Sequence, residues 1–449
     1  MNFFARMRRR LQHSDLFVVF NFREEHAFGR TCMLLSAILG TIVTYLTAGT
    51  LYTAFLTFNN FSIADVGVIS YLPLLGACFN LFSPIILERF KRRRWILAGG
   101  RFVYQTINIV GLTLLALFVH DPTAKLVGFG AIVFLASLIN NLFGSGYTVW
   151  HLNFIPEDVR AKYISYQQTI TTLFSGMVLL VSSAAADALR GTPNEGALLT
   201  ALRFIGYVVA VIEIIVLILP REYDYPQKER VRLSSIFRLP MQNRKFLATM
   251  GIMAFWTFLS HLPAASWSYY VLNTAQTSIT MISMLDFVYG FFLLILSPFW
   301  RRMLRKHSWF STFVIASFMH APTAFACAFV TADTQIWLYP LMRIGQHIAG
   351  VGLNLAYANF PYINTPKENQ TCYISFYMLL INLVAFIAQL CGNTIIRLVG
   401  DNTVPMLGVP MSVPQLLMFT QGVLILVCAV LIMRFHTVLT PQPATEAEA

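Results

Sequence analysis

The sequence predicts an all-α polytopic membrane protein with twelve transmembrane helices in two pseudo-symmetric six-helix bundles. Of its 449 residues, 57% are apolar and only 12% are charged, whereas a soluble domain carries about 25% charged residues. Apolar runs of about 20 residues, long enough for a helix to cross a bilayer, recur along almost the whole chain. Two segments of the first half also have counterparts in the second half. The composition therefore indicates a chain that is solvated by hydrocarbon.

The expected spans share a length of about 20 residues or more and an almost uncharged composition. Proline and glycine inside several spans are compatible with helices, because neighbouring helices can cover the backbone. The six cysteines lie in or at the ends of spans without paired spacing, so we expect no disulfide framework and no metal site. The spans are predicted at residues 32–57, 66–87, 95–119, 124–149, 163–186, 197–219, 246–272, 278–300, 309–331, 335–359, 371–398 and 412–434.

The basic residues indicate the orientation of the chain, whose formal net charge is +12. If the N-terminus is cytoplasmic, nearly all basic residues fall in or beside cytoplasmic segments, as the positive-inside bias requires. We therefore expect both termini to be cytoplasmic, and we expect no nucleic-acid binding. The start "MNFFARMRRR" is interpreted as retained, and the run "LFVVFNF" as lying along the inner membrane surface. The exceptions to the charge bias are Lys125, Arg190, Arg203, Arg343 and Arg397.

Two pairs of similar segments indicate an internal repeat. Residues 83–95, "SPIILERFKRRRW", and residues 297–309, "SPFWRRMLRKHSW", place Ser-Pro, a basic block and a Trp in the same register. Residues 155–165, "IPEDVRAKYIS", match residues 365–375, "TPKENQTCYIS", at a similar offset. Two echoes with nearly equal offsets predict a duplicated six-helix unit. The expected parts are a cytoplasmic N-terminal segment (1–31), a first bundle (32–219), a cytoplasmic linker (220–245), a second bundle (246–435) and a cytoplasmic tail (436–449).

Two parallel six-helix halves are typical of transporters in which the substrate binds near the membrane midplane and the halves rock about it. The chain resembles the major facilitator superfamily over nearly all of its length. The signature loop of that family, after the second helix, is Gly-x-x-x-Asp-Arg-x-Gly-Arg, and Pro and Lys replace its two glycines here. The resemblance implies that Glu88 helps to close a cytoplasmic gate, whereas in the alternative interpretation the arginines only mark a cytoplasmic flank. The corresponding residues are Pro84, Glu88, Arg89, Lys91 and Arg92.

The tenth predicted span carries the most informative polar residues. An ionisable side chain near a helix centre costs about 2.5 to 3.5 kcal/mol on insertion scales, so a polar face should line a cavity instead of facing lipid. Spacings of 4, 3, 4 and 3 residues place five side chains on one face of this helix. These residues are Arg343, His347, Gly350, Asn354 and Tyr357.

Asp286 lies in the eighth span, at a depth similar to that of Arg343 and His347. Our main hypothesis is that Asp286 pairs with Arg343 or His347, and that the pair binds a polar substrate or is broken by protonation during a transport cycle. The alternative is a static buried salt bridge that fixes helix packing. Under either hypothesis, removing one partner should have a large effect because the other charge would be left unpaired.

Further polar side chains lie on the first, fourth, fifth and seventh helices, which line the pathway in the family that the chain resembles. Together with aromatic residues such as Trp267, they suit a neutral, hydroxyl-rich ligand such as a sugar. Hydrogen bonds between helices are the alternative explanation. Glu213 is interpreted as internally hydrogen-bonded or snorkelling to the lipid edge, with ion coupling as the alternative, and His320 is interpreted as a structural histidine. For His261, a structural histidine is the alternative interpretation. The further candidates are Tyr45, Asn140, Tyr147, Gln168 and His261.

The function expected from these observations is secondary active transport of a small polar solute by alternating access across a bacterial inner membrane. We expect a sugar-like substrate, with H⁺ as the candidate coupling ion. The lipid bilayer is the expected partner, and we expect that a monomer can complete the transport cycle. The sequence lacks phosphate-binding, paired-histidine and nucleophile-elbow motifs, so we expect no enzyme activity and no cofactor. The alternatives are a non-transporting scaffold or sensor with the same fold, a lipid-flipping protein, and a drug exporter, which is disfavoured because the fifth helix lacks a Gly-Pro pattern.

Overall fold

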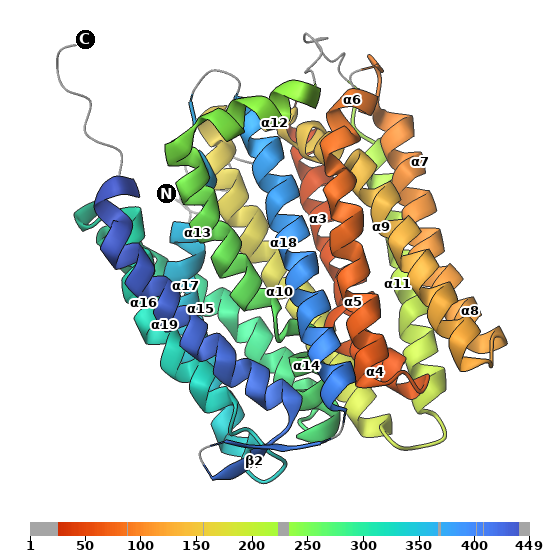
Figure 1. Cartoon of the computed structure of the whole chain (residues 1–449). Coiled ribbons are helices and arrows are strands. Elements are labelled where there is room, and N and C mark those ends of the chain that lie inside the picture. The colour runs from red at the N-terminus through yellow and green to blue at the C-terminus, as the bar shows by residue number, and fades with distance from the viewer. Residues whose placement is uncertain are drawn as a thin grey trace, which may run out of the picture. The chain divides into compact units, whose positions relative to one another are not determined.

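The chain forms two compact units, one of Met1–Asn59 with Phe82–Arg230 and one of Asn60–Leu81 with Val231–Ala449. Helices account for nearly all of the described residues (Figure 1). The predicted N-terminal segment up to residue 25, Glu88, residues 223–232 of the linker and the tail from residue 440 lie outside those residues. The predicted domain boundaries stay a prediction. The computed structural model describes residues 26–87, 89–155, 157–222, 233–366, 370–400, 402–406 and 408–439.

Eleven helical segments of the described residues are long and apolar enough to cross a membrane, and each overlaps a span that the sequence predicts. The fold class is thereby confirmed as all-α and polytopic. These segments are Ala27–Phe58, Ile63–Phe82, Arg94–Phe118, Pro122–His151, Tyr166–Leu189, Glu195–Ile218, Arg244–Thr274, Ile279–Lys306, Trp309–Cys327, Cys372–Val399 and Val413–Phe435.

The remaining predicted span is α17, Gln335–Tyr357, which has 23 residues. At 1.5 Å per residue its length is about 35 Å, enough to cross a bilayer. Arg343, Gln346, His347 and Asn354 interrupt its apolar sequence, and it is not among the eleven apolar segments. The predicted span that is missing from those segments is therefore the one with the predicted polar face.

The helices of the first unit begin and end at recognisable local signals. The carboxylate of Asp121 accepts a hydrogen bond from the Ala124 amide at 2.7 Å, and Pro122 occupies the first turn of α9, where no amide is required. Gly49, with φ of +62°, begins α4 immediately after the C-cap residue of α3. The elements are α3 (Ala27–Thr47), α4 (Gly49–Phe58), α6 (Ser83–Leu87), α7 (Arg94–Gln105), the π-helical η2 (Thr106–Gly111), α8 (Leu112–Phe118), α9 (Pro122–Leu152), α10 (Glu157–Leu189) and α11 (Glu195–Ile218).

The second unit contains the remaining described helices and one short hairpin. Ser278 and Ser308 cap α15 and α16 by accepting amide hydrogen bonds at 3.1 Å. Its elements are α5 (Ile63–Ala77), η1 (Cys78–Phe82, which continues into the first unit), α12 (Leu233–Gln242), α13 (Arg244–His261), α14 (Ala264–Tyr269), the π-helical η3 (Tyr270–Thr274), α15 (Ile279–Lys306), α16 (Trp309–Cys327), α17, η4 (Phe360–Tyr362), α18 (Gln370–Val399), β1 (Val404–Met406), β2 (Val409–Met411) and α19 (Val413–Leu439).

Close contacts explain why α5 belongs to the second unit, where it packs against α18. A Cβ atom on Gly67 would lie 2.2 Å from Asn393 Oδ1, so only glycine permits this approach of the two helices. Tyr71 meets Phe386 edge-on, with ring centroids 5.3 Å apart.

The packing confirms the internal repeat. In the first unit α3 packs against α10 and α11, and α9 packs against α6 and α7. Six helices later, α13 packs against α18 and α19, and α17 packs against α15 and α16. The repeated residues Tyr163 and Tyr373 are both buried, and their hydroxyls donate to the carbonyls of Arg30 at 2.9 Å and Leu239 at 3.3 Å. The duplicated sequence therefore specifies a duplicated pattern of helix packing.

Candidate functional site

The predicted ion pair forms between α15 and α17, which pack against each other. Arg343 Nη2 donates to Asp286 Oδ1. Arg343 Nη1 donates to Gln346 Oε1 at 3.1 Å, one turn further along α17. The side chain of Arg343 is 27% exposed and that of Asp286 is 46% exposed, so the pair is not fully buried. Of the two partners that the sequence left open for Asp286, Arg343 is the one that binds it.

His347 lies one turn from Arg343 and takes a different role. Its Nε2 lies 3.0 Å from the carbonyl oxygen of Leu285, which can only accept, so Nε2 carries a proton. The side chain is buried, and its ring centroid lies 5.1 Å from that of Tyr289. His347 therefore ties α17 to the backbone of α15 beside the ion pair.

The rest of the predicted face of α17 also turns toward its neighbours in the second unit. Asn354 Nδ2 donates to the hydroxyl of Tyr289 on α15. The hydroxyls of Tyr357 and Thr257 lie 2.7 Å apart and join α17 to α13. A Cβ atom on Gly350 would lie 3.9 Å from the Tyr289 ring. The spacing of 4, 3, 4 and 3 residues thus describes one real face, directed at α13 and α15.

A pocket of about 490 Å³ lies beside the ion pair in the second unit. Two of its nitrogens, Arg343 Nε and His320 Nδ1, are buried and have no hydrogen-bond partner among the described residues. Buried polar atoms without a partner are rare in proteins, and a bound molecule could supply the missing partner. The lining residues are Ser260, Pro263, Ala264, Trp267, Asp286, Tyr289, His320, Arg343, Gln346, His347, Met418 and Gln421.

Sequence reasoning missed some of these residues. Tyr289 follows Asp286 by three positions and Gln346 follows Arg343 by three, so helical spacing from the predicted pair would have found both. Ser260 and Gln421 carry no such signal, because they lie on α13 and α19, far from the pair in sequence.

His261 does not line the pocket. Its Nδ1 lies 2.9 Å from the carbonyl oxygen of Thr257, one turn earlier on α13, and donates to it. The backbone therefore already satisfies this nitrogen, as in the structural interpretation.

The four first-unit candidates have varied surroundings. The hydroxyl of Tyr147 donates to the Leu97 carbonyl at 2.9 Å, and the Arg101 guanidinium lies 5.3 Å from its ring centroid. Gln168 is exposed, whereas Tyr45 and Asn140 are half-buried. None of the four lines the pocket of the second unit.

The predicted gate loop is only partly described. Arg89 and Arg92 are exposed, Pro84 lies in α6, and Glu88 is outside the described residues. A second carboxylate, which the sequence reasoning did not assign, holds this loop: the backbone amides of Arg93 and Arg94 both donate to Glu222, the latter at 2.7 Å.

A second ion pair is buried within the first unit. Arg101 Nε donates to Glu213 Oε2 at 2.8 Å, and the Ser36 hydroxyl donates to Glu213 Oε1 at 2.6 Å. The interpretation of Glu213 as internally hydrogen-bonded is therefore confirmed, in preference to snorkelling. Arg101, which the charge pattern placed in a cytoplasmic flank, contributes the countercharge.

Comparison with known proteins decides the fold. No family model matches the sequence, and no curated protein matches it. The solved nucleoside transporter NupG has a TM-score of 0.63 at 13% identity, over 92% of this chain and 99% of its own. The chain has the major facilitator fold. Two further solved structures have the same fold. The POT family transporter PepTSo has a TM-score of 0.65 at 14% identity, over 91% of this chain and 98% of its own. A D-xylose–proton symporter has a TM-score of 0.62 at 14% identity, over 93% of this chain and 98% of its own. The expected resemblance to the major facilitator superfamily is thus confirmed at the level of the fold.

Proposed function

We propose that this chain is a secondary transporter that moves a small polar solute across a bacterial inner membrane by alternating access, with both termini cytoplasmic. The major facilitator fold supports this proposal, because its solved neighbours include a nucleoside transporter, a POT family transporter and a D-xylose–proton symporter. The duplicated packing supports it as well, since two repeats are the elements that rock in alternating access.

The observation that carries the proposal is the pocket beside the Asp286–Arg343 pair. A volume of about 490 Å³ falls in the usual range for small-molecule sites, about 300 to 1,000 Å³. The side chains of Asp286 and Arg343 are part-exposed and line this cavity, so a solute in it could contact both charges. In our proposal Asp286 and Arg343 contact the solute, and His347 holds α17 in register with α15.

The lining suits a solute rich in hydroxyl groups. Ser260, Gln346 and Gln421 supply uncharged donors and acceptors, and Trp267 and Tyr289 supply aromatic faces. The unpartnered Nε of Arg343 adds a donor for an oxygen of the solute. A sugar-like substrate remains our first candidate.

H⁺ is our candidate coupling ion. Protonation of Asp286 would remove the charge that holds Arg343, so that the guanidinium could turn to a substrate oxygen. A carboxylate that is part-exposed to a cavity is accessible to protons from water in that cavity.

Transport can be tested without knowing the solute. Cells that express wild type, Arg343→Gln or the control Arg397→Gln at matched membrane levels are grown in complex medium, and mass spectrometry follows each small molecule in the medium. We expect wild type and the control to deplete at least one polar compound relative to empty-vector cells, and Arg343→Gln to do so about tenfold more slowly or worse. Arg397 is an exposed residue at the end of α18, so the control removes the same charge elsewhere.

Other outcomes would favour the alternatives. A wild type that matches empty-vector cells for every compound would contradict transport and favour a scaffold or sensor. A compound that accumulates in the medium of wild-type cells would indicate export. Equal rates for wild type and Arg343→Gln would contradict the assignment of the site.

A further inference from the structure

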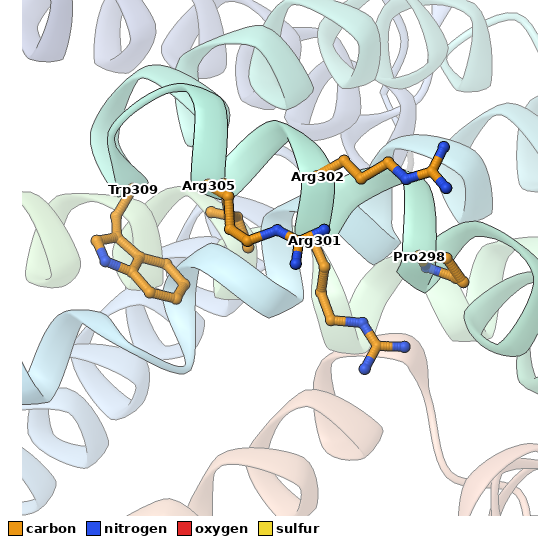
Figure 2. Close-up of a pocket in the computed structure, with 6 residues that line it drawn as sticks. Pro298, Arg301, Arg302, Arg305 and Trp309 are labelled. Atoms are coloured by element: carbon orange, nitrogen blue, oxygen red, sulfur yellow. The ribbon is translucent and has the colours of Figure 1, made fainter.

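A second pocket, of about 460 Å³, lies at the end of α15 (Figure 2) and shares no lining residue with the pocket beside the ion pair. Three arginines and three apolar residues line it. Arg301 and Arg305 are four positions apart and share one face of the helix, and Figure 2 shows the Arg305 side chain extending toward Arg301. The full lining is Pro298, Arg301, Arg302, Leu304, Arg305 and Trp309.

No described carboxylate neutralises these arginines. Arg301 Nε donates to the Ser297 carbonyl at 3.3 Å, and none of the three guanidinium groups forms an ion pair within the described part of the chain. All three side chains belong to exposed residues. The pocket therefore presents a concentrated positive charge.

The related loop of the first unit is different. There Glu222 accepts hydrogen bonds from the amides of Arg93 and Arg94. The repeat also places Arg302 at the position that corresponds to Glu88, so the second copy has a cation where the first has an acid. Among the residues that the structure describes, the second loop thus has no carboxylate in the place of Glu222, and its sequence has Arg302 in the place of Glu88, which leaves its charge available for an external anion.

The position along the chain indicates where that anion comes from. The arginines occupy the last turns of a membrane-spanning segment, Ile279–Lys306, and the part-exposed Trp309 begins the next one. Arginine and tryptophan at the ends of spans lie at the level of the lipid headgroups. Guanidinium groups bind phosphate oxygens in a bidentate manner, and basic pockets between membrane helices bind anionic headgroups.

We propose that this pocket binds the phosphate headgroup of an anionic phospholipid. The guanidinium groups of Arg301, Arg302 and Arg305 contact the phosphate, and Trp309, Leu304 and Pro298 pack against the glycerol and the first acyl carbons. This site is independent of the proposed transport function, because it uses neither the central pocket nor a transported solute.

Native mass spectrometry of the purified full chain in detergent tests the proposal. Phosphatidylglycerol is titrated against wild type, Arg301→Gln/Arg305→Gln and the control Lys306→Gln/Arg434→Gln, with phosphatidylcholine of the same acyl chains as the neutral lipid. Lys306 is the matched control because it lies with Arg305 in the last turn of α15 but does not line the pocket. Its removal changes the interaction with the helix dipole in the same way as removal of Arg305. We expect wild type and control to bind phosphatidylglycerol alike, and the pocket variant to bind it about tenfold more weakly.

Three results would overturn the proposal. The first is equal binding of the two lipids by wild type, and the second is an equal loss in the control and pocket variants, which would indicate general charge attraction. The third is displacement of phosphatidylglycerol by millimolar inorganic phosphate, which would indicate a site for a free anion. Size-exclusion profiles verify that each variant is folded, and the single variant Arg302→Gln replaces the double variant if that one aggregates.

Discussion

Glu213 shows how one charged residue is accommodated in the apolar interior of the first unit. Its side chain is only 2% exposed, yet both carboxylate oxygens are bonded, one to Ser36 and one to Arg101. A buried pair of this kind contributes little net stability, but removal of one partner leaves the other charge without compensation.

Glu213→Gln should therefore destabilise the protein by about 3 kcal/mol. This value is the lower end of the range for broken buried pairs, and we choose it because the side chain of Arg101 is 22% exposed. Thermal unfolding of the purified protein in detergent measures the effect. Asp333→Asn, which changes an exposed carboxylate, is the control. Arg101→Gln/Glu213→Gln should recover part of the loss, and a Glu213→Gln variant as stable as the control would disprove the coupling.

Residue-level prediction from the sequence worked where a polar face interrupts an apolar helix. Asp286 and Arg343 could be paired because each lies about equally deep in its span. The Arg101–Glu213 pair could not be found this way, because 112 positions separate the two residues and neither lies on a periodic polar face. Its formation depends on which helices of the first unit are neighbours, and that is tertiary information.

At the scale of elements, the π-helical turn η2 depends on an arginine from another helix. Arg203 of α11 is 2% exposed, and its Nη2 donates to the carbonyls of Asn108 at 3.0 Å and Ile109 at 3.5 Å within η2. Its Nε donates to Thr113 Oγ1 at 2.8 Å, and its guanidinium lies 4.6 Å from the Phe55 ring centroid. Carbonyls left free by a π-turn are thus satisfied by a planar cation.

Arg203→Lys should lower the free energy of unfolding by about 2 kcal/mol or more, although the charge is retained. A lysine ammonium cannot reach Thr113 and the η2 carbonyls from one position, so bonds to a charged donor are lost. Thermal unfolding beside Arg397→Lys, an exposed control, measures this effect. Equal stability of the two variants would show that charge alone is sufficient at this site.

The elements themselves were largely predictable, with two informative exceptions. The polar face of α17 reduces its apolar character, yet its length and spacing indicated a helix at 335–359, which the structure has at Gln335–Tyr357. In the hairpin β1–β2, Pro405 pairs with Pro410, and each strand has only three residues. Strands of this length are too short to give a periodic signal in the sequence. The predicted linker contains α12, whose Ile236 and Pro240 are buried, and its apolar residues were hidden by the surrounding charges.

At the scale of the whole molecule, the duplication accounts for the helix packing in each unit but not for the charged pairs. At the offsets of the two sequence echoes, Leu72 and Val133 stand where Asp286 and Arg343 would have their counterparts. The second repeat therefore carries an ion pair beside a pocket, and the corresponding positions of the first repeat cannot form such a pair. This asymmetry is the expected result if a duplicated scaffold has acquired a binding site in one copy.

In our proposal the Asp286–Arg343 pair acts in transport and is not only a support for helix packing. Uptake of the solute found in the medium survey is measured in proteoliposomes, with and without an inward proton gradient, for wild type and Asp286→Asn/Arg343→Gln. The double variant removes both charges together, so it leaves no unpaired buried charge and should fold. Our account predicts uptake that the gradient accelerates in wild type and a rate at least about tenfold lower in the folded double variant. A double variant that transports as fast as wild type would contradict the account and leave the pair a structural salt bridge.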